Sequence, residues 1–209
     1  VWAAIHQQYV SALRELPRER FGLPWWKRPL DIAAAAALLA LSAPLLGALA
    51  LAVRVDLGAG ALYRQRRIGL GERPFEILKF RTMRPQPDPP RLSDAERLSR
   101  LGRFLRRASL DELPQFVNVL RGEMSVVGPR PERPVFVERF RQTVPGYMLR
   151  HKVKSGITGW AQVNGLRGNT SLEKRIEFDL EYIERWSFWL DLKIIGLTVV
   201  RVLFDRNAY

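Results

Sequence analysis

The sequence contains no cysteine, which excludes disulfide bonds and thiolate metal sites. Histidine is also scarce. His6 and His151 are too few to form a zinc site without help from carboxylates. Acidic residues are outnumbered, because 21 Asp and Glu stand against 34 Lys and Arg and leave a net charge of +13 over 209 residues. This excess indicates a polyanionic partner, such as nucleic acid, anionic lipid or a phosphorylated substrate.

Charge is absent from residues 32–53, a run made mainly of Ala and Leu. A helix of this length can cross the hydrocarbon core of a bilayer, roughly 30 Å thick, so a transmembrane span is the simplest interpretation. Two features favour a re-entrant helix instead. Pro44 lies just past the middle and would break the helix, with Ser42 placed to bond a freed carbonyl. Both flanks are basic, which puts both ends on the cytoplasmic side. The flanking basic residues are Lys27 and Arg28 before the run, and Arg54, Arg64, Arg66, Arg67 and Arg73 after it.

Residues 109–132 are the most informative part of the chain. Two adjacent carboxylates, Asp111 and Glu112, follow Arg106 and precede a Gly-Pro-Arg-Pro-Glu loop that contains Arg130. Arginine binds phosphate oxygens with paired hydrogen bonds, and a carboxylate can attack phosphorus or hold Mg²⁺. The pattern therefore indicates chemistry on a phosphate.

A purely structural interpretation of the same residues is available. Ser109 followed by Glu112 fits a capping box at the start of a helix. Pro114 would then lie inside that helix, where it removes a hydrogen bond. We favour the alternative in which a helix runs over about 114–121 and Gly122 ends it. In that case the two carboxylates lie outside the positive end of the helix.

The first half of the chain also predicts three further elements. Residues 1–24 have apolar positions at helical spacing. Residues 61–83 predict a small β-hairpin with a turn at 69–72, and a proline-rich linker follows over 84–92. A capping box at Ser93 and Glu96 predicts an amphipathic helix over 94–107, which suits either an anionic membrane surface or an ordinary protein core.

The second half predicts mostly helices. We expect one helix over 131–150, a glycine-rich loop over 153–168, and a helix that begins at a capping box on Thr170 and runs to about Trp186. Residues 190–204 form a second apolar surface that is interrupted by charges and should not span a membrane. The fold class expected is α+β and mainly helical.

Five motifs in order resemble the bacterial sugar transferases known as monotopic phosphoglycosyl transferases. The resemblance covers residues 27–209 and implies a catalytic domain of that extent, preceded by a helical extension over 1–26. Within the family, the chain is most similar to undecaprenyl-phosphate glucose phosphotransferases. The motifs are Lys27-Arg28 with Asp31, the run Lys79 to Met83, the run Ser109 to Gln115, the run Val127 to Glu132, and the run Gly156 to Gly165.

The resemblance implies transfer of hexose-1-phosphate from a UDP-sugar to undecaprenyl phosphate. The expected donor is UDP-glucose, and UDP-galactose is the alternative. UMP is then the second product. In this scheme Asp111 forms a covalent aspartyl phosphosugar. Asp111 and Glu112 are the residues expected to hold Mg²⁺, and Glu112 alternatively positions a proton. The residues implied to bind the substrate are Lys79, Arg81, Arg106 and Arg130, whose charges offset the diphosphate. Glu132 is a weaker candidate, and its alternative role is to orient Arg130.

The resemblance also implies a place in the cell, namely the cytoplasmic face of the bacterial inner membrane. Membrane lipids are then partners of the protein. Assembly into a homodimer is neither implied nor excluded. The product would enter exopolysaccharide, capsule or lipopolysaccharide synthesis. The competing hypothesis is a non-catalytic basic adaptor on anionic membranes. A nucleic-acid partner is not expected, because recognisable binding motifs are absent and such a role would not explain residues 32–53.

Overall fold

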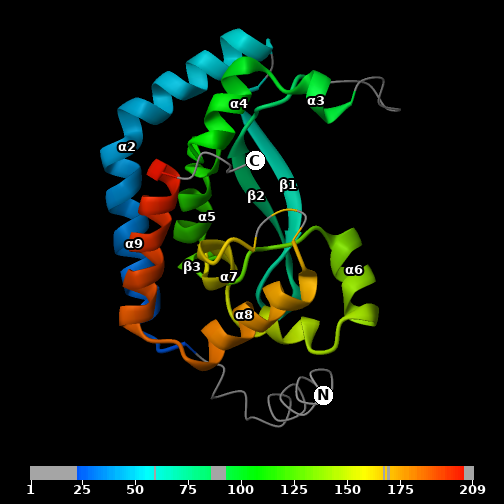
Figure 1. Cartoon of the computed structure of the whole chain (residues 1–209). Helices are drawn as coiled ribbons and strands as arrows, with labels where there is room; N and C mark the ends of the chain where they lie inside the picture. The colour runs from blue at the N-terminus through cyan, green and yellow to red at the C-terminus, as the bar shows by residue number, and fades with distance from the viewer. Residues whose placement is uncertain (1–22, 59, 86–92, 167, 169, 205–209) are drawn as a thin grey trace.

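A computed structural model describes residues 23–58, 60–85, 93–166, 168 and 170–204 (Figure 1). Helices of different lengths surround two small two-stranded sheets, so the expectation of a mainly helical α+β chain is confirmed. The expected helix over 1–24 lies outside the described residues except for its last two positions. Most of the expected linker over 84–92 lies outside them as well.

The apolar run lies within one helix, α2 (Lys27–Leu57), which continues through Pro44. The expected break at this proline is therefore not confirmed, although Figure 1 shows the helix changing direction between its blue and cyan parts. The Ser42 hydroxyl donates to the carbonyl of Leu38, 2.5 Å away. It does not bond the Ala40 carbonyl, which Pro44 leaves without its usual N–H partner. Such back-bonding by serine often bends a helix.

Among the described residues, α2 is the one helix long and apolar enough to cross a membrane. Its middle carries exposed apolar side chains, and Leu41 is 82% exposed. The re-entrant course, with both ends on one side, stays a prediction, because length and composition do not fix a path through a bilayer. Only the two ends of the helix are buried, at Lys27, Asp31 and Ala35 and again at Leu49, Val53 and Leu57.

A buried polar network fixes the N-terminal end of α2 to the rest of the chain. The Lys27 ammonium lies 2.5 Å from a carboxylate oxygen of Asp191, at the start of α9 (Phe188–Phe204). One turn later, Asp31 accepts a hydrogen bond from the Ser125 hydroxyl at 2.7 Å. Tyr182 donates to the other Asp191 oxygen at 2.8 Å. The first of the five motifs is thus a structural anchor for the apolar helix.

The expected hairpin is confirmed. Strands β1 (Leu62–Ile68) and β2 (Pro74–Phe80) are antiparallel, with Tyr63 opposite Lys79, and the short 3-10 helix η2 (Leu70–Glu72) forms the turn between them. The Asn118 side chain joins helix α5 (Gln115–Arg121) to this hairpin, because its oxygen accepts a hydrogen bond from the Leu78 N–H at 3.0 Å.

The carboxylate pair lies on a separate turn of 3-10 helix, η3 (Leu110–Glu112), and α5 (Gln115–Arg121) begins after it. Gly122 ends α5 with φ 86°, a left-handed conformation that glycine adopts without a steric penalty. The Ser109 side chain makes no capping bond. The capping-box interpretation of Ser109 and Glu112 is therefore wrong, and the alternative is confirmed to within one residue.

The helix expected over 94–107 is divided into α3 (Asp94–Arg97) and α4 (Arg100–Arg107). The capping box of Ser93 and Glu96 is present, but a second serine, Ser99, accepts a bond from Gly102 N–H and starts a new helix. Leu98, between the two helices, is extended and pairs with Met83. The local pairing with the chain that follows β2 thus interrupts the helix. Lipid contact by these helices stays a prediction.

The helix expected over 131–150 is shorter. Helix α6 (Pro134–Thr143) ends before Pro145, and Gly146, with φ 74°, starts the 3-10 helix η4 (Tyr147–Lys152). Proline disfavours the helical conformation in the residue before it, which accounts for the early end.

The glycine-rich stretch is more structured than expected. It contains β4 (Gly156–Thr158), which pairs in parallel with β3 (Ser125–Val127), and the short helix α7 (Trp160–Val163). The next helix, α8 (Leu172–Glu184), is capped by Ser171 rather than Thr170. The core between α2, α8 and α9 includes Ala35, Ile176 and Ile194.

Candidate active site

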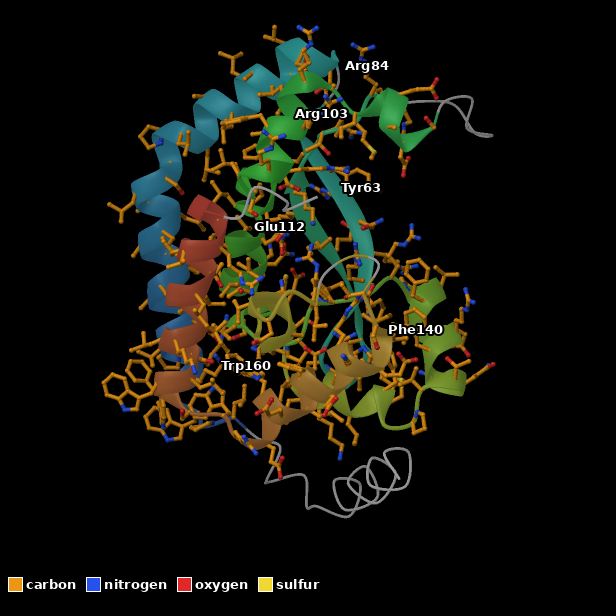
Figure 2. All side chains as sticks on the ribbon, in the orientation of Figure 1. Tyr63, Arg84, Arg103, Glu112, Phe140 and Trp160 are labelled. Atoms are coloured by element: carbon orange, nitrogen blue, oxygen red, sulfur yellow. The ribbon has the colours of Figure 1, made fainter. Side chains whose placement is uncertain are left out.

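The turn η3 places Asp111 and Glu112 inside the protein, where they are 5% and 9% exposed. The preceding residue in this turn region, Ser109, has φ 53°, which is uncommon for a residue other than glycine. Backbone strain of this kind is often found at functional sites. Figure 2 labels Glu112 beside the hairpin, and Tyr63 on the hairpin itself.

Two cations bind Glu112. The Lys79 ammonium lies 2.6 Å from Oε1. Arg130 donates through Nη2 to Oε1 at 2.6 Å and through Nη1 to Oε2 at 3.3 Å. Burial by itself would raise the pKa of Glu112, but Arg130 and Lys79 more than offset it and hold that pKa well below its ordinary range. Glu112 is therefore a fixed anion at neutral pH.

Asp111 has the opposite environment. Its Oδ1 is buried and accepts no hydrogen bond from the described residues. Burial, and then the negative charge of Glu112, raise the pKa of Asp111 to about 6 against the pull of Lys79, Arg106 and Arg130. Neighbouring carboxylates whose pKa values are pushed apart are typical of divided catalytic roles. Near pH 7 most Asp111 is therefore ionised.

Asp111 lines a cavity of about 410 Å³, a size typical of ligand sites. The wall is dominated by cations, which suits a diphosphate. Its charged lining residues are Arg67, Lys79, Arg81, Arg97, Arg106, Arg130 and Arg133, with Asp94 and Asp111 as the acids. We call this space the cationic cavity.

The basic residues expected at the site all lie on this cavity. Lys79 and Arg130 bind Glu112, as described above. Arg106 donates through Nε to the Thr82 hydroxyl at 3.0 Å, which orients its guanidinium. Arg81 donates through Nε to the Gly60 carbonyl at 2.9 Å. The structure therefore brings these four predicted side chains together.

The ion pairs of Glu132 join it to two other arginines, and its role in orienting Arg130 stays a prediction. Its carboxylate lies 3.1 Å from Arg175 and 3.7 Å from Arg67, on separate oxygens. It is also absent from the lining of the cationic cavity. Glu132 holds Arg67, which is the cavity residue.

Sequence reasoning missed Arg67 as a site residue and treated it only as a basic flank. Tyr63, Gln65 and Arg67 alternate along β1, so they share one face of the hairpin. Lys79 lies opposite Tyr63 and faces the same way. The alternation of residues along the predicted hairpin, with Lys79 already expected at the site, could have identified Tyr63, Gln65 and Arg67 as residues on the same face.

The Gly-Pro-Arg-Pro-Glu loop is held by close backbone contact with β4. Gly128 N–H donates to the Thr158 carbonyl and Gly156 N–H donates to the Pro129 carbonyl, both at 2.9 Å. A Cβ on Gly156 would lie 2.1 Å from the Gly128 nitrogen, so no larger residue fits there. Arg150 donates to the Arg130 carbonyl at 2.8 Å. These bonds fix the backbone from which Arg130 reaches Glu112.

The residues present fit a Mg²⁺ ion only if the phosphates of the substrate supply the remaining ligands. The described residues contain no group of three or more His, Asp or Glu side chains placed to hold a metal. Asp111 offers one unbonded oxygen, whereas both Glu112 oxygens accept bonds from Lys79 or Arg130. Mg²⁺ commonly binds through one or two carboxylates together with substrate phosphates. This arrangement suits Asp111 better than Glu112 as a ligand.

Comparison with known proteins places this site in a family context. The chain is 49% identical over 191 residues to the UDP-glucose:undecaprenyl-phosphate glucose-1-phosphate transferase of Escherichia coli K12, covering 88% of this chain and 41% of that protein. It is 47% identical to the Caulobacter vibrioides protein of the same name, over 92% of this chain and 75% of that protein. An Aeromonas hydrophila protein named for transfer of N-acetylgalactosamine phosphate is 38% identical, over 98% of this chain and 49% of that protein.

The chain thus spans about two-fifths of the length of its Escherichia coli relative and about three-quarters of its Caulobacter relative. The family model described as bacterial sugar transferase matches residues 23–205, which include every residue of the candidate site. The chain belongs to the bacterial sugar transferase family.

Proposed function

We propose that this chain transfers glucose-1-phosphate from UDP-glucose to undecaprenyl phosphate, giving undecaprenyl-diphosphate-glucose and UMP. The observation that carries the proposal is the carboxylate of Asp111, buried and with an unbonded oxygen, at the wall of a cavity with seven cationic side chains. The cationic side chains can bind the diphosphate of a sugar nucleotide, and the carboxylate can attack its phosphorus. The names of the relatives at 47–49% identity support the choice of both substrates.

In the first step, an Asp111 oxygen attacks the phosphorus that carries the sugar. A new bond forms between that oxygen and phosphorus, and the bond from phosphorus to the bridging oxygen of the diphosphate breaks. UMP leaves with the bridging oxygen and its electron pair. The covalent product is an aspartyl phosphosugar, in keeping with the general strategy of carboxylate nucleophiles.

In the second step, a phosphate oxygen of the lipid acceptor attacks the same phosphorus. The bond to Asp111 breaks, the carboxylate is restored, and a new diphosphate bond joins the sugar phosphate to the lipid. No proton has to be gained or lost by Asp111 over the cycle. The ionised state that its raised pKa allows near pH 7 is the state required at the start.

Glu112 acts indirectly in this scheme. It holds Arg130 and Lys79 in the wall of the cationic cavity, which would bind the diphosphate. Arg106, braced by Thr82, adds charge near Asp111. These preorganised cations stabilise the charge that develops on the leaving UMP. Asp111 would hold Mg²⁺, which would supply further neutralisation of the phosphate charge.

The two substrates come from different phases, since the sugar nucleotide is soluble and the acceptor is a lipid. The exposed apolar surface of α2 suits insertion into one leaflet, with the cationic cavity left at the membrane surface. We place the chain on the cytoplasmic face of the bacterial inner membrane, where nucleotide sugars are made. The lipid-linked sugar would then start an exopolysaccharide, capsule or lipopolysaccharide chain.

The proposal is tested by measuring UMP release from a panel of UDP-sugars by detergent-solubilised protein, with and without undecaprenyl phosphate. UDP-glucose should be the best donor. Without undecaprenyl phosphate each protein molecule should release at most one UMP, whereas with the lipid it should release many. Preference for UDP-galactose would change the sugar and leave the reaction intact. No UMP release from any common UDP-sugar would favour the non-catalytic membrane adaptor.

A further inference from the structure

One aromatic side chain lies open in the wall of the cationic cavity. Among the described residues that line this wall, Tyr63 and Phe80 are the aromatic ones, and Tyr63 is 41% exposed whereas Phe80 is only 4% exposed. Tyr63 lies opposite Lys79 in the hairpin, so both side chains leave the same face of the sheet. Lys79 reaches Glu112 from that face, which puts the Tyr63 ring on the side of the carboxylate pair (Figure 2). The proposed reaction as described so far gives this ring no role.

The Tyr63 ring is fixed on one side by a braced arginine. The Arg81 guanidinium carbon lies over the ring, 5.8 Å from its centroid. Arg81 is held there by the carbonyls of Gly60 and Leu62, to which it donates at 2.9 and 3.4 Å. A cation over an aromatic ring covers only one of the two faces. The other face is left as a flat apolar surface in a wall that is otherwise dominated by charge.

The place of this ring along the cavity indicates which part of the sugar nucleotide it meets. The attacked phosphorus carries the hexose, so both lie beside Asp111. The nucleoside is separated from that phosphorus by the second phosphate. Tyr63 is the cross-strand neighbour of Lys79, and Arg81 lies two residues beyond Lys79, about 7 Å along the strand. Toward Arg67, four residues along β1 from Tyr63, no further aromatic side chain lines the cavity in the described part of the chain.

Resting on the proposed function, we propose that Tyr63 binds the nucleoside end of UDP-glucose, with the uracil stacked on the open face of its ring and Arg81 over the opposite face. Stacking of a base on an aromatic side chain raises affinity by roughly five- to 150-fold. Because every base has a flat face, Tyr63 contributes affinity for the nucleotide rather than a preference for uracil. The cations along the hairpin bind the diphosphate that leads to the nucleoside.

The hexose and the isoprenoid chain of the acceptor also have apolar surfaces that could pack on this ring. The hexose is bonded directly to the attacked phosphorus, which keeps it beside Asp111. The isoprenoid chain would have to bury Lys79 and Arg81 against hydrocarbon, which is costly for charged groups. Uracil suits the place better than either, because it has a flat face for the ring and carbonyl oxygens for the neighbouring cations. The experiments below separate the three ligands.

The first experiment measures binding of UDP and of inorganic pyrophosphate to the detergent-solubilised protein by calorimetry. Tyr63→Leu should weaken UDP binding by roughly five- to 150-fold and leave pyrophosphate binding unchanged, because pyrophosphate has no base. Tyr63→Phe keeps the ring and should keep the affinity for UDP. Phe104→Leu is the matched control, because Phe104 is 56% exposed and does not line the cavity, and it should change neither affinity. Equal UDP affinity in the unmodified protein and Tyr63→Leu overturns the inference and leaves the proposed function intact, whereas no UDP binding by the unmodified protein overturns both.

The second experiment changes the base instead of the protein. Dihydrouridine diphosphate keeps the carbonyl and N–H groups of UDP but has a puckered, non-aromatic base. The unmodified protein should bind it more weakly than UDP, and Tyr63→Leu should bind the two equally. A general distortion of the hairpin in Tyr63→Leu would instead lower both affinities by the same factor and keep the difference between them, which would overturn the inference. If Tyr63→Leu weakens binding of UDP-glucose but not of UDP, the ring binds the hexose, and if it slows only transfer to undecaprenyl phosphate, the ring binds the lipid. Either result would show the inference to be wrong.

Discussion

Asp111 and Glu112 are consecutive residues on one 3-10 turn, yet Glu112 accepts hydrogen bonds from Lys79 and Arg130, whereas Asp111 Oδ1 accepts none from the described residues. The cations on Glu112 lower its pKa, while burial and the charge of Glu112 raise the pKa of Asp111 to about 6. One carboxylate is thereby fixed as a structural anion and the other is kept available. This asymmetry is the physical basis of the proposed division of roles.

The first prediction concerns the pH dependence of the first step. Only ionised Asp111 can attack phosphorus, so the single-turnover rate of UMP release should rise with pH through a midpoint near 6 and level off above about 7. An ordinary aspartate would give a midpoint near 4. Rapid-quench measurements from about pH 5 to pH 8 decide between these values. A rate independent of pH over that range would contradict a buried aspartate nucleophile.

The second prediction concerns stability. The folded-state pKa of Asp111 lies above its ordinary value of 3.8, so folding favours the protonated form. The resulting stabilisation is present below about pH 4 and is lost as pH rises through about 6. Asp111→Asn removes the buried charge and should therefore be more stable than the unmodified protein at pH 7.5, by on the order of 2 kcal/mol.

Thermal unfolding in detergent without added Mg²⁺ measures this difference. The gap in Tm between Asp111→Asn and the unmodified protein should widen between about pH 4 and pH 7 and then stay constant. Asp94→Asn is a suitable control, because Asp94 is exposed and lines the same cavity. A Tm gap that is constant over the whole range would show that Asp111 has an ordinary pKa.

The third prediction concerns Glu112→Gln. The neutral amide weakens both ion pairs and leaves Lys79 and Arg130 partly uncompensated, which should lower the free energy of unfolding by about 1–3 kcal/mol. Turnover should fall with it, because both cations lose their fixed positions. The Mg²⁺ concentration for half-maximal activity should not change, since the Glu112 oxygens are already bonded. A shift of that concentration to higher values would instead identify Glu112 as a metal ligand.

Several local features of this chain could be predicted from the sequence. The hairpin, the end of α5 at Gly122 and the cationic partners of the carboxylate pair all follow from residue type and spacing. The division of the helix over 94–107 did not, because it depends on pairing between Leu98 and Met83. A single backbone bridge to a segment outside the helix overrides local helix propensity, and helix periodicity does not display it.

The charge partners show the same limit. The carboxylate of Glu132 pairs with Arg67 and Arg175, two residues far from it in sequence, and nothing in the local spacing indicates these partners. Gln162 lies in one of the five motifs, yet the sequence does not indicate that its side-chain oxygen is buried without a hydrogen-bond partner among the described residues. Pairing between elements that are far apart along the chain is a property of the packed fold.

The fourth prediction concerns the path of α2 through the membrane. Because the chain contains no cysteine, single cysteines can be introduced after Val1 and after Gly58 without a background signal. Both should react with a membrane-impermeant thiol reagent from the cytoplasmic side only, as expected for a re-entrant helix. A cysteine in place of Leu41, in the exposed apolar middle, should be protected until detergent is added. Labelling of the two flanks from opposite sides would establish a transmembrane span.

The most direct test of the central claim is to look for the covalent intermediate on Asp111. The protein is incubated with UDP-glucose in the absence of undecaprenyl phosphate, and its intact mass and peptides are measured. The account predicts one added hexose phosphate on the peptide that contains Asp111, loss of the adduct when acceptor lipid is added, and no adduct in Asp111→Asn, whose UMP release should fall by on the order of 10³ or more. A folded Asp111→Asn protein that still carries the adduct, or that releases UMP at a near-normal rate, would contradict the account.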